Sequence, residues 1–134
     1  MTSSPADADW VPWDRPSPLL DALGGFLHLP DDPHRARFRV EGPKVNARGA
    51  LHAGAIAAVA DVVIGHAVAR RSDPPTPLVT VNLSCDLLGA AGPGDVVDVE
   101  VTSTRLGRRL GAGTAVFTCG PREVARVSAL FLPA

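Results

Sequence analysis

A single carboxylate inside a long apolar stretch has the clearest potential for chemistry in this sequence. Asp61 is the only formally charged side chain between Gly49 and Ala69. Burial of an unpaired carboxylate is costly, so we expect Asp61 to have a hydrogen-bond partner, a shifted protonation equilibrium or an opening onto a cleft. In a cleft it could act as a general base or as a nucleophile. A structural aspartate that faces solvent or a partner's amide is the alternative.

The start of the predicted helix supplies a second chemical feature. This helix is expected at residues 53–71, directly after His52, and it ends in two arginines, which suit the negative end of the helix dipole. Its first N–H groups, those of Ala53 and Gly54, have no acceptor within the helix and would point outward. Such a helix start can hold an oxyanion or a polarised carbonyl oxygen. For His52, a hydrogen bond to the local backbone is the alternative.

The spacing of these two features bears on the oligomeric state. Ala53 and Asp61 are eight residues apart in the sequence, and this separation is roughly 12 Å along a helix. One small carbonyl group therefore cannot contact both within one chain. If both act on the same group, one of them must come from a second copy of the protein. The sequence therefore predicts a homodimer with a shared site.

The two faces of the predicted helix differ in side-chain size. At about 100° per residue, one face carries Ile56, Val59 and Val63, and the opposite face carries Gly54, Ala58, Asp61 and Gly65. The first face suits packing against a sheet, whereas small residues allow another backbone to come close. We therefore expect a second subunit to cover the face that carries Asp61.

The remaining pattern predicts the elements that position this helix. A short helix is expected at 18–23, and strands are expected at 26–29, 35–40, 79–87, 97–101, 111–119 and 123–132, with a turn at 30–33. Residues 1–17 are expected to form a loose arm whose Trp10 and Trp13 cap apolar surface, and residues 18–134 a single domain. This order predicts an α+β fold, with a mostly antiparallel sheet wrapped around one long central helix.

Composition argues against several classes of partner. The chain of 134 residues has a formal net charge of −1, four Phe, two Trp and no Tyr, which disfavours nucleic-acid binding. The longest apolar stretch, residues 53–69, is interrupted by Asp61 and His66 and is a poor membrane span. Residues 1–18 contain no apolar run that could be a secretory signal. The two cysteines lie far apart without metal-ligand spacing. We therefore expect a cytoplasmic protein with no metal, nucleic-acid or membrane partner.

The stretch from Asn46 to Asp61 resembles the hotdog-fold acyl-CoA thioesterases. The closer likeness is to the phenylacetate-pathway type and to the 4-hydroxybenzoyl-CoA thioesterases, which typically contain Asn, Gly and His-Gly-Gly before the helix and an Asp or Glu within it. Residues 78–83 and 92–95 resemble the family's next strand and the following turn. The resemblance implies a hotdog fold, an obligate homodimer often assembled into a homotetramer, and active sites at the dimer interface. It implies no cofactor beyond the coenzyme A of the substrate.

The resemblance also implies roles for individual residues. Asp61 would be the catalytic carboxylate, acting as general base or nucleophile, and the Ala53 amide would hold the thioester oxygen. Asn46 would orient substrate or water, His52 would support the loop, and Thr80 would position the water near Asp61. The substrate would be a small or aromatic acyl thioester of coenzyme A or of an acyl-carrier protein. Ala53 stands where the family has its first glycine after the histidine, and its methyl group would narrow the acyl pocket.

Two further groups of residues are candidates for substrate binding. Arg105, Arg108 and Arg109 flank Gly107 at a predicted turn between strands. They could contact coenzyme A phosphates, because the arginine fork suits phosphate geometry. An exposed basic loop is the alternative. His66 is expected to be an interface residue or part of a pocket wall.

Two other functions stay open. The five-residue offset between Asp61 and His66 is that of one hotdog enoyl-CoA hydratase motif, although in those enzymes the pair lies in a loop before the helix. Ala53 leaves room for a non-catalytic acyl-CoA-binding protein. The sequence contains neither a Gly-x-Ser-x-Gly elbow nor a GxxxxGK(S/T) phosphate-binding loop.

Overall fold

The computed structural model of the chain describes residues 9–134. Its elements, in chain order, are β1 (Val11–Pro12), α1 (Pro18–Leu23), β2 (Leu27–Leu29), β3 (Asp32–Arg39), the 3-10 helix η2 (Gly42–Lys44), α2 (Ala53–Ala69), β4 (Leu78–Leu87), β5 (Val96–Leu106), β6 (Gly111–Cys119) and β7 (Arg122–Pro133). The predicted order of a short helix, two strands, one long helix and four further strands is confirmed.

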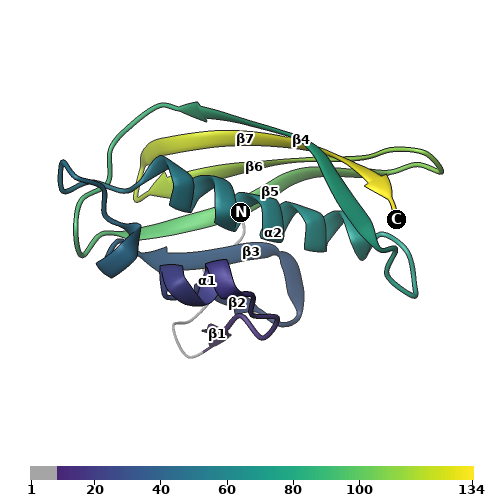
Figure 1. Cartoon of the computed structure of the whole chain (residues 1–134), viewed down its shortest axis with the longest axis horizontal. Helices are drawn as coiled ribbons and strands as arrows, with labels where there is room; N and C mark the ends of the chain where they lie inside the picture. Colours follow the sequence, from purple (N-terminus) through teal and green to yellow (C-terminus); the bar gives the residue numbers. More distant parts are fainter. Residues whose placement is uncertain (1–8) are drawn as a thin grey trace.

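The strands form one antiparallel sheet that curves around α2 (Figure 1). The strand order is β1-β2-β3-β5-β6-β7-β4, so that β1 and β4 are the two edges. Helix α2 contacts β3, β4, β5, β6 and β7. The predicted α+β architecture, a sheet wrapped around one central helix, is therefore confirmed.

The two faces of α2 are covered very differently. The side chains predicted to face the sheet are almost fully buried, with exposed fractions of 3% for Ile56, 1% for Val59 and 3% for Val63. On the opposite face Ala58, Asp61 and Gly65 are half-buried and Gly54 is exposed. Within one subunit this second face is therefore only partly covered. No helix within residues 9–134 is long and apolar enough to cross a membrane.

Glycines on β6 allow α2 to lie close to the sheet. A Cβ atom on Gly113 would lie 2.5 Å from Ile64 Cγ2 and 3.1 Å from Val68 Cγ2. A Cβ atom on Gly111 would lie 3.0 Å from Val68 Cγ1. These neighbours are β-branched side chains with restricted rotation, so they cannot easily swing away. The close spacing between helix and sheet therefore depends on glycine, which has no side chain, at positions 111 and 113.

Three predicted boundaries differ from the structure by two residues or more. Strand β5 runs to Leu106, five residues beyond the predicted end at 101. Helix α2 ends at Ala69 rather than at Arg71, and the N–H of Thr76 donates to the carbonyl oxygen of Ala69 at 3.1 Å, which satisfies one of the last helical carbonyls. Strand β3 already begins at Asp32, which pairs with Leu29, so the turn before it is shorter than the four residues predicted.

The predicted loose arm, residues 1–17, lies partly outside the described residues, because the structure describes the chain only from residue 9. Within the described part, β1 pairs with β2, and Trp10 is only 8% exposed. The N–H of Trp13 donates to the carbonyl oxygen of Phe26 at 2.9 Å. This part of the arm is held against the domain rather than loose, because burial of the two large indoles is favourable.

Replacement of Gly113 by alanine tests the close approach of helix and sheet. Alanine by itself would favour the fold by about 0.5–1 kcal/mol, because glycine loses more conformational freedom on folding. We expect the clash with Ile64 to outweigh this gain, so that Gly113→Ala lowers the free energy of unfolding by about 1–3 kcal/mol. Urea unfolding followed by circular dichroism measures the change.

Gly92→Ala is the matched control, since a Cβ atom there has its nearest contact at 3.9 Å, with Asp95. Equal losses of stability in the two variants would contradict the packing argument.

Candidate active site

Among residues 9–134 the Asp61 side chain has one hydrogen-bond partner, which comes from the neighbouring edge strand. Thr80 lies on β4 opposite Phe131, and its Oγ1 donates to Asp61 Oδ1 at 2.5 Å. The structure thus brings together two residues that the sequence separates by a helix end and a loop. Because Thr80 fixes one carboxylate oxygen, the other can face a reacting group.

Asp61 and Thr80 line a cleft of about 450 Å³. Helix α2 contributes one wall with Asp61, Gly65 and Ala69, which lie on the same side of the helix at successive turns. The other lining residues are Trp13, Arg15, Val62, His66, Pro75, Thr76, Pro77, Leu78, Thr80 and Phe131. Small residues on the helix and rings opposite them make this a cleft for a largely apolar group.

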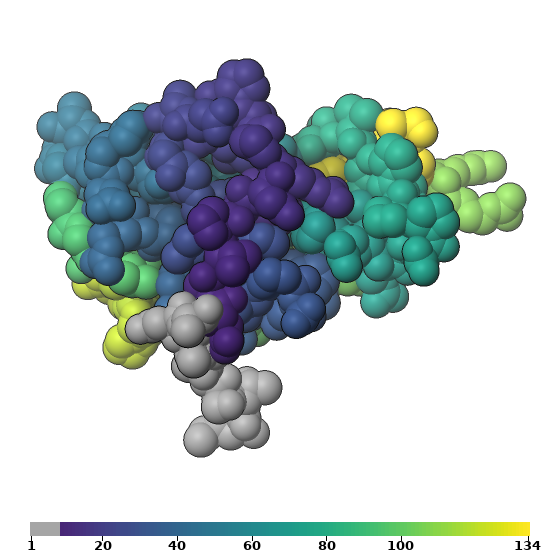
Figure 2. Space-filling model, turned by 90° about the horizontal axis from the view of Figure 1, so that it is seen from below, coloured from purple at the N-terminus to yellow at the C-terminus, as the bar shows by residue number. Residues whose placement is uncertain are grey.

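The N-terminal segment forms part of this cleft, which the sequence did not predict. Trp13 and Arg15 line it, and Figure 2 shows the N-terminal residues, in purple, lying across this face of the molecule beside the teal residues that follow α2. In the sequence, the one indication that this segment packs against the domain is a tryptophan in an otherwise polar, proline-rich stretch. The partner of that tryptophan is decided by the fold.

His66 forms part of the cleft wall and is uncharged at pH 7. Its ring meets the Trp13 indole edge to face, with 4.9 Å between centroids. Burial, together with the positive charges of Arg70 and Arg15, lowers the pKa of His66 to about 4. The imidazole therefore carries no charge under ordinary conditions and adds little to the electrostatics around Asp61.

The start of α2 offers one open N–H group rather than two. His52 is the N-cap, and its Nδ1 accepts a hydrogen bond from the N–H of Gly54 at 2.8 Å. This matches the local alternative considered for His52. Among residues 9–134 the N–H of Ala53 has no hydrogen-bond acceptor, and Ala53 is exposed. Of the two predicted donors, the Ala53 amide is thus the one open to a ligand.

Asn46 shapes the loop that leads into α2. Its Oδ1 accepts hydrogen bonds from the N–H groups of Arg48 at 2.9 Å and Ala50 at 3.1 Å. Its own N–H donates to the carbonyl oxygen of Ala50 at 2.7 Å. The side-chain oxygen is therefore engaged within the loop, and only the side-chain NH2 could point toward a substrate.

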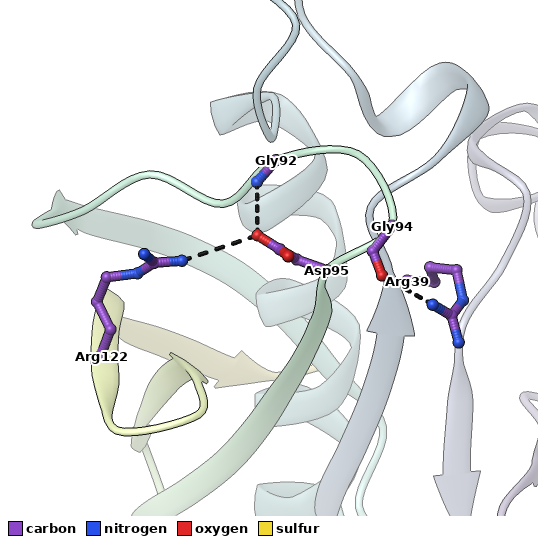
Figure 3. A network of polar contacts seen from close by, with 5 residues as sticks. All are labelled: Arg39, Gly92, Gly94, Asp95 and Arg122. Carbon is purple, nitrogen blue, oxygen red and sulfur yellow. Dashed lines mark hydrogen bonds and ion pairs between the residues drawn. The ribbon is translucent and has the colours of Figure 1, made fainter.

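A second loop anchors this one from behind. The N–H of Leu51 donates to the carbonyl oxygen of Ala91 at 2.8 Å. The next turn is closed by Asp95, whose Oδ2 accepts from the N–H of Gly92 at 2.8 Å and lies 3.7 Å from an Arg122 nitrogen (Figure 3). These contacts fix the backbone two residues before Ala53, and with it the direction of the open amide.

The carboxylate and the open amide do not meet within one subunit. Helix α2 is continuous from Ala53 to Ala69, so the amide at its start and Asp61 remain roughly 12 Å apart. In the structure, as in the sequence, the two groups of one chain therefore cannot both contact one small carbonyl group.

The predicted phosphate contacts lie apart from the cleft. Arg105, Arg108 and Arg109 line a separate hollow of about 840 Å³ at the turn between β5 and β6, and all three are exposed. No described residue of this hollow lines the Asp61 cleft. The turn projects from the end of the molecule at which α2 ends (Figure 1). Within residues 9–134 no group of three His, Cys, Asp or Glu side chains could hold a metal ion.

The sequence and the fold both match known proteins. The pattern of the thioesterase superfamily matches residues 48–125. A proposed esterase of Pseudomonas aeruginosa is 37% identical over 122 residues, which are 90% of this chain and 91% of that relative.

Solved structures share the fold at lower sequence identity. A mutant of the phenylacetic acid degradation protein PaaI from Thermus thermophilus superposes with a TM-score of 0.72 and 24% identity, over 88% of this chain and 100% of that chain. A hypothetical thioesterase from Streptococcus pneumoniae, with coenzyme A, has a TM-score of 0.72 and 18% identity, over 86% of this chain and 90% of its own. The family pattern covers more than half of this chain and the Pseudomonas relative nearly all of it, so the chain belongs to the thioesterase superfamily and has its hotdog fold.

Proposed function

We propose that this protein is an acyl-CoA thioesterase that hydrolyses small or aromatic acyl thioesters, with Asp61 as its catalytic carboxylate. The observation that carries the proposal is the Thr80–Asp61 hydrogen bond in a cleft lined by apolar and aromatic groups, in a chain of the thioesterase superfamily. A structural relative that contains coenzyme A supports the choice of carrier. The cytoplasmic location expected from the sequence fits such a substrate.

The proposed reaction needs few groups, because a thioester carbonyl is electrophilic and a thiolate leaves readily. As general base, Asp61 takes a proton from water, and the water oxygen bonds to the carbonyl carbon. The Ala53 N–H stabilises the negative charge that develops on the carbonyl oxygen. The C–S bond then breaks, the leaving thiolate takes up the proton held by Asp61, and the acid is released with the carboxylate restored. Direct attack by Asp61, followed by hydrolysis of the resulting anhydride, is the other route.

We propose that the Ala53 amide reaches the substrate from a second subunit. The two groups are roughly 12 Å apart on one helix, and the helix face that carries Asp61 is only partly covered. Strand β4 is an edge of the sheet, ten residues long, with β7 as its one neighbour. Val79, Val81 and Leu87 on this strand are 53%, 50% and 54% exposed. A long edge with apolar side chains is a natural surface for pairing with another chain, so we place the dimer interface there.

We assign the three arginines of the β5–β6 turn to the phosphates of coenzyme A. Their hollow is wide and carries only positive formal charge. Among the described residues, none lines both this hollow and the cleft. A substrate whose acyl group lies in the cleft and whose phosphates contact the arginines would therefore extend between the two regions.

Asp61→Asn tests the central assignment. The amide cannot accept the proton or attack the carbonyl, so we expect kcat for acyl-CoA hydrolysis to fall by about 10²–10⁴-fold. The measurement is thiol release from a panel of short, medium and aromatic acyl-CoAs.

Asp21→Asn, an exposed aspartate on α1 and away from both the cleft and β4, is the matched control and should keep its activity. Full activity in Asp61→Asn would reject the role of this carboxylate. Retained acyl-CoA binding without any turnover by the wild-type protein would favour the non-catalytic alternative, and hydration of an enoyl-CoA would favour the hydratase.

Thr80→Val tests the hydrogen bond that positions the carboxylate. Valine keeps the shape but loses the donor to a charged acceptor, whose net contribution is about 1.5–3 kcal/mol. We expect a loss in kcat of roughly 10- to 100-fold with little change in KM. Thr80→Ser keeps the hydroxyl and should restore most of the rate. If serine and valine reduce kcat equally, the hydroxyl is not what positions Asp61.

Val81→Lys tests the location of the dimer interface. A charge on the β4 edge should weaken pairing, so we expect monomers by light scattering at micromolar concentration, together with loss of hydrolysis. Leu19→Lys is the control, since Leu19 is similarly exposed (61%) but lies on α1. A wild-type protein that is monomeric at concentrations where it is active would refute the shared site.

A further inference from the structure

A second cavity borders Trp13, as the Asp61 cleft does. It has a volume of about 380 Å³. Among the described residues, Trp13 is the one that lines both this cavity and the cleft of about 450 Å³. The remaining lining residues of the second cavity include Phe26, Leu27, Phe38 and Val96. The two spaces thus share one side chain as a common boundary.

The indole of Trp13 contacts one residue from each space. It stacks on Phe26 of the second cavity, with 5.2 Å between centroids and 22° between planes. It meets His66 of the cleft edge to face at 4.9 Å and 90°. Its Nε1–H donates to the carbonyl oxygen of Arg15 at 3.0 Å. Because the ring contacts one residue of each space and its polar atom is satisfied, it is fixed in place at the boundary of both.

The second cavity is partly apolar, as an extension of an acyl site would need to be. Leu27 and Val96, both half-buried, supply apolar surface. Charged side chains also line the cavity, namely those of Arg37, Arg39, Glu41 and Lys44. Its most buried charge, Lys44, is only 4% exposed and donates from Nζ to the carbonyl oxygen of Leu23 at 2.8 Å. An alkyl chain that entered the cavity would not deprive this ammonium group of its hydrogen bond, because the acceptor is a carbonyl oxygen of the protein itself.

We propose that Trp13 is the specificity-determining wall of the acyl site, which restricts substrates to short or aromatic acyl groups by closing off the second cavity. This inference rests on the proposed function, since it identifies the cleft beside Asp61 as the place of the acyl group. Removal of the indole joins the two spaces and opens room for a longer chain. The second cavity then becomes the binding site for the distal part of a medium-length or long acyl group.

The test is the ratio of kcat/KM for decanoyl-CoA to that for benzoyl-CoA. We expect Trp13→Ala to raise this ratio by about tenfold or more, since a few methylenes gained in an apolar pocket are worth at least that much. Trp13→Phe keeps a ring at this boundary and should stay close to the wild-type ratio. Adding Leu27→Phe to Trp13→Ala narrows the second cavity and should reverse most of the gain. An unchanged ratio in Trp13→Ala, or a gain that Leu27→Phe leaves intact, would overturn the proposal.

Two further measurements separate this inference from the proposed function. If the wild-type protein hydrolyses neither thioester, the proposed function fails, and the length preference is then judged by calorimetric binding of decyl-CoA and benzyl-CoA thioethers. A rise in the affinity for the decyl ligand relative to the benzyl ligand in Trp13→Ala supports the role of Trp13 as a wall. An unchanged ratio of the two affinities rejects that role. If circular dichroism shows that Trp13→Ala is unfolded, Trp13→Leu, which keeps an apolar side chain of smaller volume, replaces it in both measurements.

Discussion

The continuity of α2 from Ala53 to Ala69 is the constraint on which the candidate site depends. The helix carries an open amide at its first residue and a carboxylate more than two turns later, and its hydrogen bonds keep these two groups roughly 12 Å apart. No side-chain rotation removes that separation. A site that uses both groups on one carbonyl must therefore contain two helices. The second copy would then cover both the exposed edge of β4 and the small-residue face of α2. Oligomerisation would then be required for chemistry and would not serve stability alone.

The same helix needs contrasting surroundings on its two faces. Toward the sheet, Gly111 and Gly113 bring β6 so close that Ile64 and Val68 fill the space where side chains would stand. On the other face, Gly65 and Ala69 leave the cleft beside Asp61 open. Glycine and alanine thus have opposite effects in the two places. Glycines on the sheet let the helix come into close contact, whereas the small residues on the helix leave the cleft beside Asp61 open.

Much of the fold could be predicted from local pattern, and less of the site. The apolar face of α2 and the strands that follow it were predictable, because helical and alternating periodicities are properties of neighbouring residues. Asp61 was noticeable as a lone charge, and Thr80 became a candidate only through a family resemblance. The use of the Gly54 amide by His52 was considered as an alternative, but which amide stays open depends on one side-chain orientation. Trp13 was expected to cover some apolar surface, yet nothing in the sequence indicated that it would line two cavities.

The sequence by itself determined the identity of the groups that can react, their order along the chain and the spacing between those on one helix. These properties follow from covalent connectivity and helix geometry, which do not depend on distant parts of the chain. Only the tertiary structure decided which residues from different elements meet: Thr80 with Asp61, and Trp13 with His66 and Phe26. These contacts join residues separated by whole elements, and they exist because the sheet curves around α2 and brings its edge strand and the N-terminal segment to the same side of the helix.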